Sequence, residues 1–369
     1  MLTLLAALVA PAEGQWRLQF YHDEDKSSMA FHDLSFPSSR RGVALGMLSE
    51  ANKATPIALV TGNGGEKWET VRIKETGVSL FFLDDSTGWM VSDRGIWQTK
   101  ESGRSWTKIA SLRGVLRVFF LDAQSGFAVG MRKSVWMTAD GGKSWKPLPA
   151  AAAPKSTADY TAYHTVEFAG PLGIIAGASR PPRRSDSRRL PDWMDPEQAG
   201  RRREQPALII TLETRDGGRN WTPSVNSLFG RVSRLRLRPE GHGMVLFEYV
   251  DSFAIPSEVV RMDLRSGKSR TVFRSKDRAI TDILPLAGGS AYIAGSEVSG
   301  SMRSVPIPGK VKILRTKNFL ADGEVAWEEL EVDYRAVARR VMLATSPEGA
   351  VWAATDSGMI LKLETAPKR

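Results

Sequence analysis

Short apolar runs recur along this chain, and their length predicts β-strands rather than helices. The runs span four to six residues and are separated by Asp, Gly and Ser, as in residues 78–83, 88–92 and 96–99. The same succession returns at residues 118–122, 126–130 and 135–138. A repeated set of three such strands, followed by a turn and a fourth strand, indicates an all-β repeat architecture.

The end of each repeat carries a common motif with Thr at its first position, Asp, Asn or Glu at the third, Gly at the fifth and Trp at the eighth. The copies start 38, 39 and 76 residues apart, which is one or two repeat lengths. The four copies consist of Thr61, Asn63, Gly65 and Trp68; Thr99, Glu101, Gly103 and Trp106; Thr138, Asp140, Gly142 and Trp145; and Thr214, Asp216, Gly218 and Trp221. A fifth, degraded copy runs from Thr316 through Asn318 to Trp327.

The motif has the residues that a tight turn between two antiparallel strands requires. A short acceptor side chain can bond the amides of its own turn, and Gly adopts the positive φ that a side chain resists. The Trp begins the next strand and covers the edge of the sheet with a large apolar surface. We therefore interpret these residues as structural and assign no catalytic residue to the motif.

Seven repeats follow from the strand count, and each is the size of one propeller blade. They cover residues 31–71, 78–109, 116–148, 164–224, 232–273, 280–332 and 337–363. The seventh has only three strands, and the Trp-led run at residues 15–20 supplies the fourth. The sequence thus predicts an all-β, seven-bladed propeller of four-stranded antiparallel blades, closed by an N-terminal strand in the last blade, because closure removes the exposed sheet edge.

The N-terminal segment predicts export. Residues 1–14 form a short apolar run that ends in small residues, with Ala10 and Ala12 arranged as in a signal-peptidase site, but without the usual basic start. We expect a truncated signal peptide at 1–14, one propeller domain at 15–364 and a tail at 365–369. The protein would then be periplasmic or extracellular, and it would be cytoplasmic if the N-terminus is not a signal peptide.

Charge and composition limit the kinds of partner and site that the protein can have. The 369 residues carry a formal net charge of +10, which favours acidic partners. The absence of cysteine excludes disulfides, thiolate zinc sites and cysteine nucleophiles. The four His residues lack metal-ligand spacing, so we expect neither a metal nor a cofactor.

The motif is the Asp-box, or BNR repeat, which occurs in sialidases, sortilin-type receptors, some endoglucanases and photosystem II stability and assembly factors. Residues 82–106 and 120–145 each join a Phe, a Gly followed by Trp or Phe, and a box. In this phrase and in its N-terminal closure, the chain resembles the photosystem II stability and assembly factor family over most of its length. The resemblance implies a propeller that holds a membrane protein during assembly. It implies the fold more firmly than the photosynthetic role, because the chain adds an Arg-rich insertion and loses boxes in its second half.

The insertion is the leading candidate for partner binding. It occupies residues 179–205, between the second and third strands of the fourth blade, on the face opposite the box turns. Equivalent loops of other blades are basic as well, so the hypothesis is an Arg clamp for an acidic or membrane-associated protein. The candidate residues are Arg94, Arg132, Lys133, Arg183, Arg184, Arg188, Arg189, Trp193, Arg201, Arg202, Arg203 and Arg303. The alternative is a solvated loop insertion without function.

The sequence also bears on glycoside hydrolysis and glycan binding. A glycosidase needs two carboxylates, for which Asp93 and Asp356 hold equivalent loop positions, although both are typical of turns before Gly. A sialidase needs an Arg-Ile-Pro signature, which the sequence does not contain. Acidic glycan is the second ligand class that an Arg-rich face would fit, and we expect no nucleic acid. We therefore predict an exported, monomeric, non-catalytic binding or assembly scaffold, with a glycoside hydrolase or glycan-binding propeller as the alternative.

Overall fold

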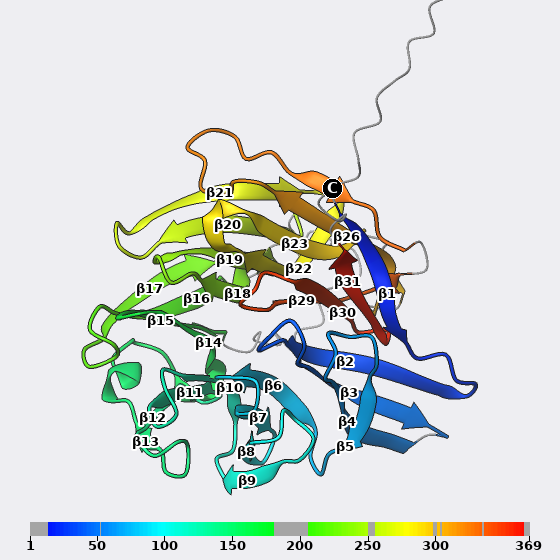
Figure 1. Ribbon diagram of the computed structural model, residues 1–369. Helices are drawn as coiled ribbons and strands as arrows, with labels where there is room; N and C mark the ends of the chain where they lie inside the picture. Colours follow the sequence, from blue (N-terminus) through cyan, green and yellow to red (C-terminus); the bar gives the residue numbers. More distant parts are fainter. Residues whose placement is uncertain are drawn as a thin grey trace, which may run out of the picture.

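The computed structural model describes residues 14–51, 53–180, 206–249, 255–297, 301–302, 305–333 and 336–364. In this part of the chain, seven four-stranded antiparallel blades surround a central channel (Figure 1). The predicted seven-bladed propeller is therefore confirmed. No helix of the described residues has the length and apolar character needed to cross a membrane.

Blades 1 to 6 are built in chain order from an inner strand at the channel to an outer strand at the rim, and blade 7 takes its outer strand from the N-terminus. The first four blades are β2 (Ser27–Ser35), β3 (Gly42–Glu50), β4 (Lys53–Thr61) and β5 (Glu69–Arg72); β6 (Gly77–Phe82), β7 (Gly88–Ser92), β8 (Gly95–Thr99) and β9 (Thr107–Ala110); β10 (Val115–Phe120), β11 (Gly126–Gly130), β12 (Ser134–Thr138) and β13 (Lys146–Pro147); and β14 (Thr161–Ala169), β15 (Leu172–Ser179), β16 (Ala207–Thr214) and β17 (Thr222–Leu228). Blades 5 and 6 are β18 (Gly230–Leu237), β19 (His242–Tyr249), β20 (Ser257–Asp263) and β21 (Lys268–Ser275); and β22 (Arg278–Pro285), β23 (Ala291–Glu297), β26 (Gly309–Thr316) and β27 (Glu328–Leu330). Blade 7 is β29 (Val341–Thr345), β30 (Val351–Thr355), β31 (Met359–Glu364) and β1 (Gln15–Tyr21).

The N-terminal strand closes the ring as predicted. β1 pairs with β31 from Gln15 opposite Glu364 to Tyr21 opposite Met359, and Trp16 is buried at 2% exposure. The start of the seventh blade needs a correction. β28 (Val337–Ala338) pairs with β26 of blade 6, so the inner strand of blade 7 begins at Val341.

The core lies between neighbouring blades. Apolar side chains from the facing sheets form a separate cluster at each junction, such as Leu45 with Met90 between blades 1 and 2 and Ile313 with Leu361 between blades 6 and 7. Burial of these surfaces against one another is the main force that holds the blades in a ring.

A Phe, a Gly and the box Trp pack together in each of blades 1 to 4. The Phe at the end of the inner strand lies edge-on to the box Trp of its own blade, with ring centroids 5.9–6.3 Å apart. Its ring also lies against the Gly that begins the second strand, so a Cβ on Gly126 would sit 2.7 Å from Phe120. The sets are Phe36, Gly42 and Trp68; Phe82, Gly88 and Trp106; Phe120, Gly126 and Trp145; and Phe168, Gly173 and Trp221. Glycine is required here because a side chain would occupy the space of the ring.

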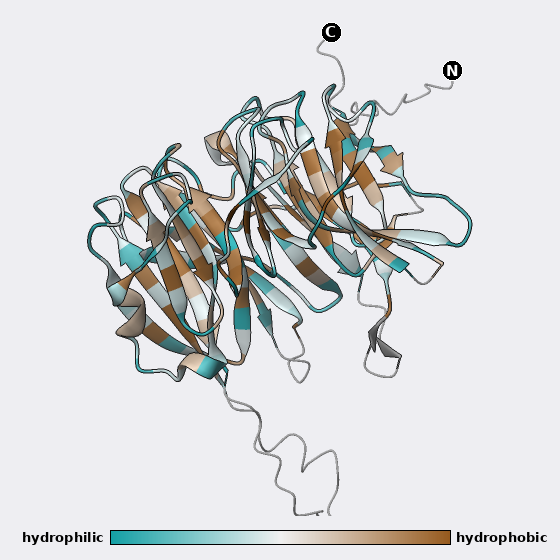
Figure 2. Cartoon of the chain, turned by 90° about the horizontal axis from the view of Figure 1, so that it is seen from below, coloured by the Kyte–Doolittle hydropathy of each residue, from teal (hydrophilic) through white to brown (hydrophobic). Residues whose placement is uncertain are grey.

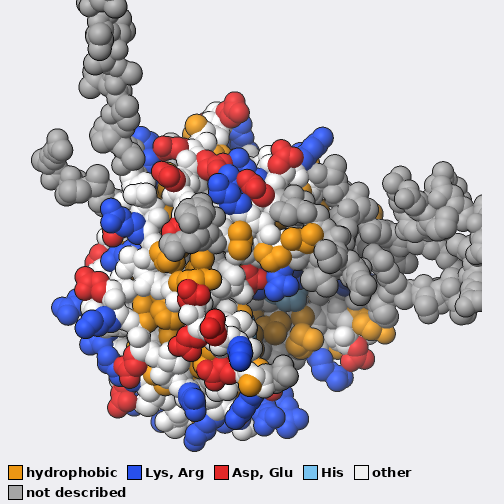
Figure 3. Space-filling view, turned by 90° about the vertical axis from the view of Figure 1, so that its right-hand side faces the viewer, with side chains coloured by type: hydrophobic (Ala, Val, Ile, Leu, Met, Phe, Trp, Pro, Cys, Tyr) orange, Lys and Arg blue, Asp and Glu red, His pale blue; other side chains and the backbone are white. Residues whose placement is uncertain are grey.

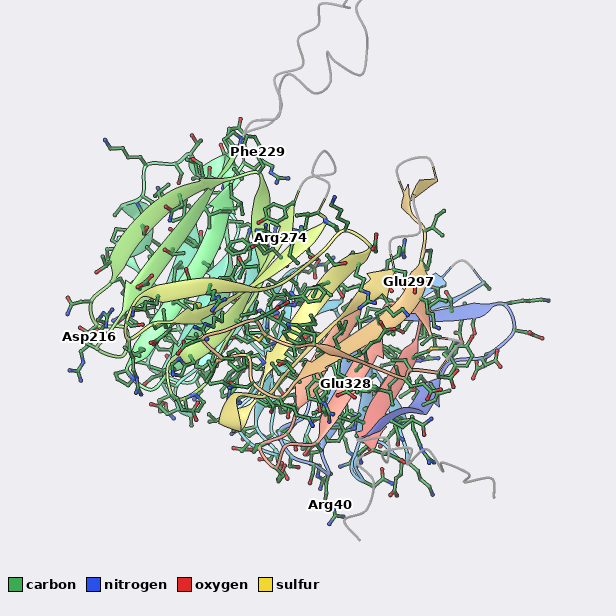
Figure 4. The ribbon with its side chains drawn as sticks, turned by 90° about the horizontal axis from the view of Figure 1, so that it is seen from above. Arg40, Asp216, Phe229, Arg274, Glu297 and Glu328 are labelled. Atoms are coloured by element: carbon green, nitrogen blue, oxygen red, sulfur yellow. The ribbon has the colours of Figure 1, made fainter. Side chains whose placement is uncertain are left out.

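The two faces of the ring carry different connections. The turns between third and fourth strands lie on the face where β1 begins and β31 ends, which we call the box face. The connections between second and third strands and between blades lie on the opposite face, which we call the loop face (Figure 2). Phe229, which follows β17, lies on the loop face, and Arg40 lies on the box face (Figure 4).

Candidate functional site

Bulges in the inner strands direct polar side chains into the channel. The pairing register shifts by one residue at the same place in six inner strands of the described chain, at His32, Val78, Leu116, His164, Ser233 and Thr281. In blades 1, 2 and 6, the residue after the bulge bonds the next blade. Asp33 accepts from Leu80 N at 2.8 Å, and Ser79 donates to Leu116 O at 2.9 Å. The extra residue of a bulge re-aims the side chains beside it, and here it makes them cross-blade ties.

The densest of these ties is centred on Asp282. This carboxylate is 1% exposed and accepts from Ile283 N at 2.9 Å and from Leu343 N at 2.8 Å. It also pairs with Arg236 at 3.0 Å and Arg234 at 3.5 Å. Arg236 reaches on to donate to Leu343 O at 2.8 Å, so blades 5, 6 and 7 are joined inside the channel. Burial lowers the pKa of Arg234 to about 10, against the opposing effect of Asp282, and the guanidinium stays charged at neutral pH.

A cavity of about 730 Å³ occupies the channel on the side of the box face. Its lining comes from the inner strands and from their connections to the second strands, in all seven blades. Figure 3 shows the molecule from the side and not along the channel, with Lys and Arg side chains spread over that surface together with Asp and Glu. The size of the cavity is within the range of small-ligand sites.

The cavity has two chemically different walls. Blades 2 and 3 contribute Phe81 and Phe119, whose ring centroids are 5.0 Å apart and whose side chains are only half-buried. Arg117 lies on the same strand as Phe119, and Arg236 and Arg238 from blade 5 make the facing wall basic. The cavity therefore has the surface of an amphipathic site.

Glu167 of β14 also lines the cavity and has an unusual titration. Burial raises the pKa of its carboxyl to about 7, although Arg117, Arg236 and a hydrogen bond from the amide of Leu237 act in the opposite direction. Burial also lowers the pKa of His164 on the same strand, and the charge of Arg231 adds to this effect. Near neutral pH, Glu167 is thus divided between its charged and neutral forms.

The box turns have a recurring hydrogen-bond pattern. In the third blade, Thr138 Oγ1 accepts from Gly142 N at 3.0 Å and donates to Asp140 Oδ1 at 2.8 Å, and Asp140 accepts from Ser144 N at 2.9 Å. Hydrogen bonds from Ser144 lower the pKa of Asp140 to about 2. Thr61 with Asn63 and Thr214 with Asp216 repeat this arrangement. The third and fifth positions therefore stabilise the turn itself.

The second box departs from this pattern because its third position is Glu101. Thr99 Oγ1 still accepts from Gly103 N at 3.0 Å, but the Glu101 carboxylate accepts from Ser105 Oγ at 2.7 Å, and its longer side chain has no bond to a turn amide within the described residues. In the degraded copy, Asn318 Oδ1 accepts from Leu320 N at 3.0 Å, and Trp327 donates to Val272 O of blade 5 at 2.8 Å.

The predicted partner-binding residues are only partly within the described chain. Arg94 and Arg132 lie on the loop face and are 70% and 76% exposed, beside Asp93 at 3.7 Å and Asp159 at 3.0 Å. Lys133 is engaged within the protein, where its ammonium donates to the carbonyls of Ala152, Pro154 and Ser156. The remaining candidates lie outside the described residues. These are Arg183, Arg184, Arg188, Arg189, Trp193, Arg201, Arg202, Arg203 and Arg303.

The two carboxylates weighed for glycoside hydrolysis both lie in loop-face turns. Asp93 is 63% exposed beside Arg94, and Asp356 accepts from the amides of Arg339 and Arg340 at 3.0 and 3.1 Å. No group of three or more His, Asp or Glu side chains suited to a metal occurs among the described residues.

The sequence interpretation missed the channel residues. Arg117, Arg234, Arg236 and Asp282 interrupt apolar inner strands, and this interruption was the available signal. A charged residue within a strand expected to lie at the centre of the ring can only face the channel or a blade junction, where it needs a partner.

Comparisons with known proteins show the fold. No family model and no curated protein matches the chain. A solved structure of YCF48 bound to D1 peptide is 14% identical with a TM-score of 0.57 and covers 94% of this chain and 99% of its own. YCF48 from Cyanidioschyzon merolae is 15% identical with a TM-score of 0.60 and covers 95% and 98%. An ancestral GH74 enzyme is 10% identical with a TM-score of 0.55 and covers 93% of this chain and 46% of its own.

The chain has the fold of the YCF48 propellers. The likeness extends over nearly the full length of both chains, whereas the GH74 enzyme is about twice as large as the matched region. At these identities the fold is what is shared.

Proposed function

We propose that this protein is a non-catalytic scaffold that binds a protein partner through its loop face and acts as an assembly factor of the Asp-box propeller type. The observation that supports this most is the full-length likeness to a YCF48 propeller that is bound to a D1 peptide. The box turns, with their repeated Thr, acceptor and Gly geometry, support the same class of propeller.

The loop face carries exposed arginines that could pair with an acidic partner. Arg94 and Arg132 present guanidinium groups to solvent in adjacent blades, and each lies beside an exposed carboxylate. Such surface pairs contribute about 0–1 kcal/mol, so a partner carboxylate can replace them at little cost. The strands that flank residues 181–205, β15 and β16, end and begin on this same face. The seven Arg residues proposed as contacts in that segment would extend the basic surface.

We favour binding over glycoside hydrolysis because of how the candidate carboxylates are held. Asp356 is committed to the amides of Arg339 and Arg340, and Asp93 lies in solvent beside Arg94. A general acid needs a raised pKa in an apolar setting, and neither position supplies such a setting. We also propose that the protein is exported, which N-terminal sequencing of the protein from its host would test: an intact Met1 would contradict export.

The binding proposal is tested with three versions of the protein: the wild type, a variant with Gln at the seven insertion Arg residues, and the double variant Arg94→Gln, Arg132→Gln. Each is used to capture partners from host membrane and soluble extracts, and the captured protein is then purified and its Kd measured at low and moderate salt. We expect both variants to weaken binding, because each lost charge-assisted pair is worth about 1.5–3 kcal/mol. A matched control, Lys143→Gln together with Arg219→Gln, removes two exposed charges from box turns. A partner that binds all four proteins equally would contradict the proposal.

A further inference from the structure

The channel cavity contains arginines that the fold does not use. Within the described residues, Arg117 has no hydrogen bond or ion pair, although it lines the cavity two residues from Phe119 on the same strand. Arg238 lines the same cavity, and its Nε is buried without a hydrogen-bond partner in that part of the chain. By contrast, the neighbouring Arg234 and Arg236 are both paired with Asp282.

An unpaired, partly buried guanidinium is costly, so its presence indicates a ligand that supplies the missing acceptor. Burying a hydrogen-bonding group without a partner costs about 1–3 kcal/mol, and more when the group is charged. Arg117 is half-buried, and among the described residues no carboxylate forms an ion pair with it. Asp33 is bonded to backbone amides of Leu34 and Leu80, and Asp282 is occupied by Arg234 and Arg236. Glu167 interacts with Arg117 only at longer range and is partly protonated near neutral pH.

The aromatic wall indicates what the rest of the ligand is. Phe81 and Phe119 each leave part of a ring facing the cavity, and Leu83 at the mouth is 37% exposed. Aromatic rings in this arrangement pack favourably against a flat or aliphatic group. The cavity volume of about 730 Å³ accommodates a ligand of small-molecule size.

We propose that the channel cavity binds a small amphipathic monocarboxylate, whose carboxylate pairs with Arg117 and whose apolar part packs on Phe81 and Phe119. Arg238 lies nearer the box face and supplies a second positive charge at the mouth. This site is separate from the loop face, so it does not depend on the proposed protein partner.

We expect the affinity for the ligand to depend on pH, because Glu167 also lines the cavity. The groups that face Glu167 are Arg117 of β10, Arg236 and the Leu237 amide of β18, and Asp282 of β22, with His164 on its own strand. A bound carboxylate would repel the charged form of Glu167, so binding should take up a proton. We therefore expect tighter binding at pH 6 than at pH 8, and Glu167→Gln should remove most of this difference.

The test uses the full chain and pairs of probes that differ only in charge: indole-3-acetate with indole-3-acetamide, and octanoate with octanamide. Calorimetric titration at pH 6 should show binding of at least one acid and at least about tenfold weaker binding of its amide, as expected for loss of a charge-assisted bond. Arg117→Gln should weaken binding of that acid by about tenfold or more. Arg113→Gln, which removes an exposed charge from the same blade, should leave binding unchanged.

Folding is checked by the thermal midpoint of each variant. If Arg117→Gln is unstable, two other variants test the same cavity: Phe119→Leu removes a ring from the same strand, and Arg238→Gln removes a charge from blade 5. Both should weaken binding of the acid. The proposal would be overturned if neither acid binds at millimolar concentration, if acid and amide bind equally, or if folded Arg117→Gln binds like the wild type.

Discussion

Blades 2 to 4 and blades 5 to 6 hold the same four-stranded architecture together in different ways. The first group uses the box turn, the Phe–Trp edge contact and the Gly beneath the ring. The second group has one Phe–Trp edge contact, between Phe273 and Trp327 at 5.9 Å, and adds charged ties. Among these ties are Arg278 with Glu329 at 2.7 Å and Arg315 with Glu328 at 2.8 Å. Glu328 is labelled in Figure 4 on the blade 6 side of the molecule.

The turn of blade 5 shows how the box can be replaced. Asp263 accepts from Arg265 N at 2.9 Å and from Ser266 Oγ at 2.6 Å, and Gly267 N donates to Asp263 O at 2.9 Å. β20 and β21 pair from Ser257 opposite Ser275 to Asp263 opposite Lys268, next to this turn. A blade of this propeller therefore needs a hydrogen-bonded turn between its third and fourth strands, and more than one sequence can form that turn.

The largest loss of stability is expected from Asp282→Ala, which removes the carboxylate at the centre of the charged ties between blades 5, 6 and 7. The substitution leaves Arg234 and Arg236 without their shared carboxylate inside the channel. Loss of one partner from a buried ion pair costs about 3–5 kcal/mol, which urea unfolding would measure. Asp322→Ala is the control, because its fully exposed carboxylate pairs with Arg261 at 3.3 Å and its loss should cost less than about 1 kcal/mol. Similar losses in the two variants would contradict the assigned role of Asp282.

Gly126→Ala adds one methyl group against the Phe ring of blade 3 and should disturb the packing of Phe, Gly and Trp in that blade. The new Cβ would lie 2.7 Å from Phe120 and 2.9 Å from the carbonyl oxygen of Phe119, and the backbone oxygen cannot move aside easily. Overpacking of this kind costs about 1–3 kcal/mol. Gly323→Ala, whose Cβ would meet no atom within 4 Å, should differ little from the wild type in the same unfolding assay. If Gly126→Ala is as stable as Gly323→Ala, the ring contact does not explain the glycine.

Glu101→Asp should sharpen the comparison by restoring a regular box in blade 2. The shorter side chain can accept from the turn amides as Asp140 does, because Thr99 already holds the turn through Gly103 N. We expect a gain of about 0.5–1.5 kcal/mol, the net worth of one hydrogen bond. The parallel change Glu66→Asp, outside the acceptor position of the first box, should give no gain.

Asp140→Asn should have the smallest effect at neutral pH, because Asn63 fills the same role in blade 1. In the folded protein, the pKa of Asp140 is lowered from 3.8 to about 2, so its stabilising effect is present above about pH 4 and is lost as the pH falls toward 2. The Asn variant should therefore lose less stability between pH 4 and pH 2 than the wild type does. Denaturant midpoints at pH 7, 4, 3 and 2.5 would measure this, with Asp322→Asn as the control. An unchanged acid limb would contradict the assignment.

Much of the architecture could be read from local pattern. The box spacing and the Trp-led run at residues 15–20 were sufficient for the blade count and for closure by β1. The start of blade 7 was misplaced because residues 337–338 have the composition of a strand, and they do form one, but with blade 6. Strand composition does not specify which neighbour a strand pairs with.

The candidate sites were less predictable for a physical reason. Lys133 is predicted from sequence to be a partner-binding loop cation, yet three carbonyls from residues 152–156 accept from its ammonium. Asp282 and Arg236 are separated by 46 residues, and no local pattern relates them. Only the neighbouring positions of β18 and β22 around the channel bring them into contact.

The sequence by itself determined the repeat, because each blade depends on short-range rules: alternating strands, an acceptor and a glycine in the turn, and a Trp that begins the outer strand. Tertiary structure alone decided the chemistry of the channel. Bulges in six inner strands of the described chain turned Arg and Asp side chains inward, and the closure of the ring made residues far apart in sequence share one low-dielectric space. Charges in such a space are coupled to whatever faces them, and which groups face one another is set by the ring and not by any one blade.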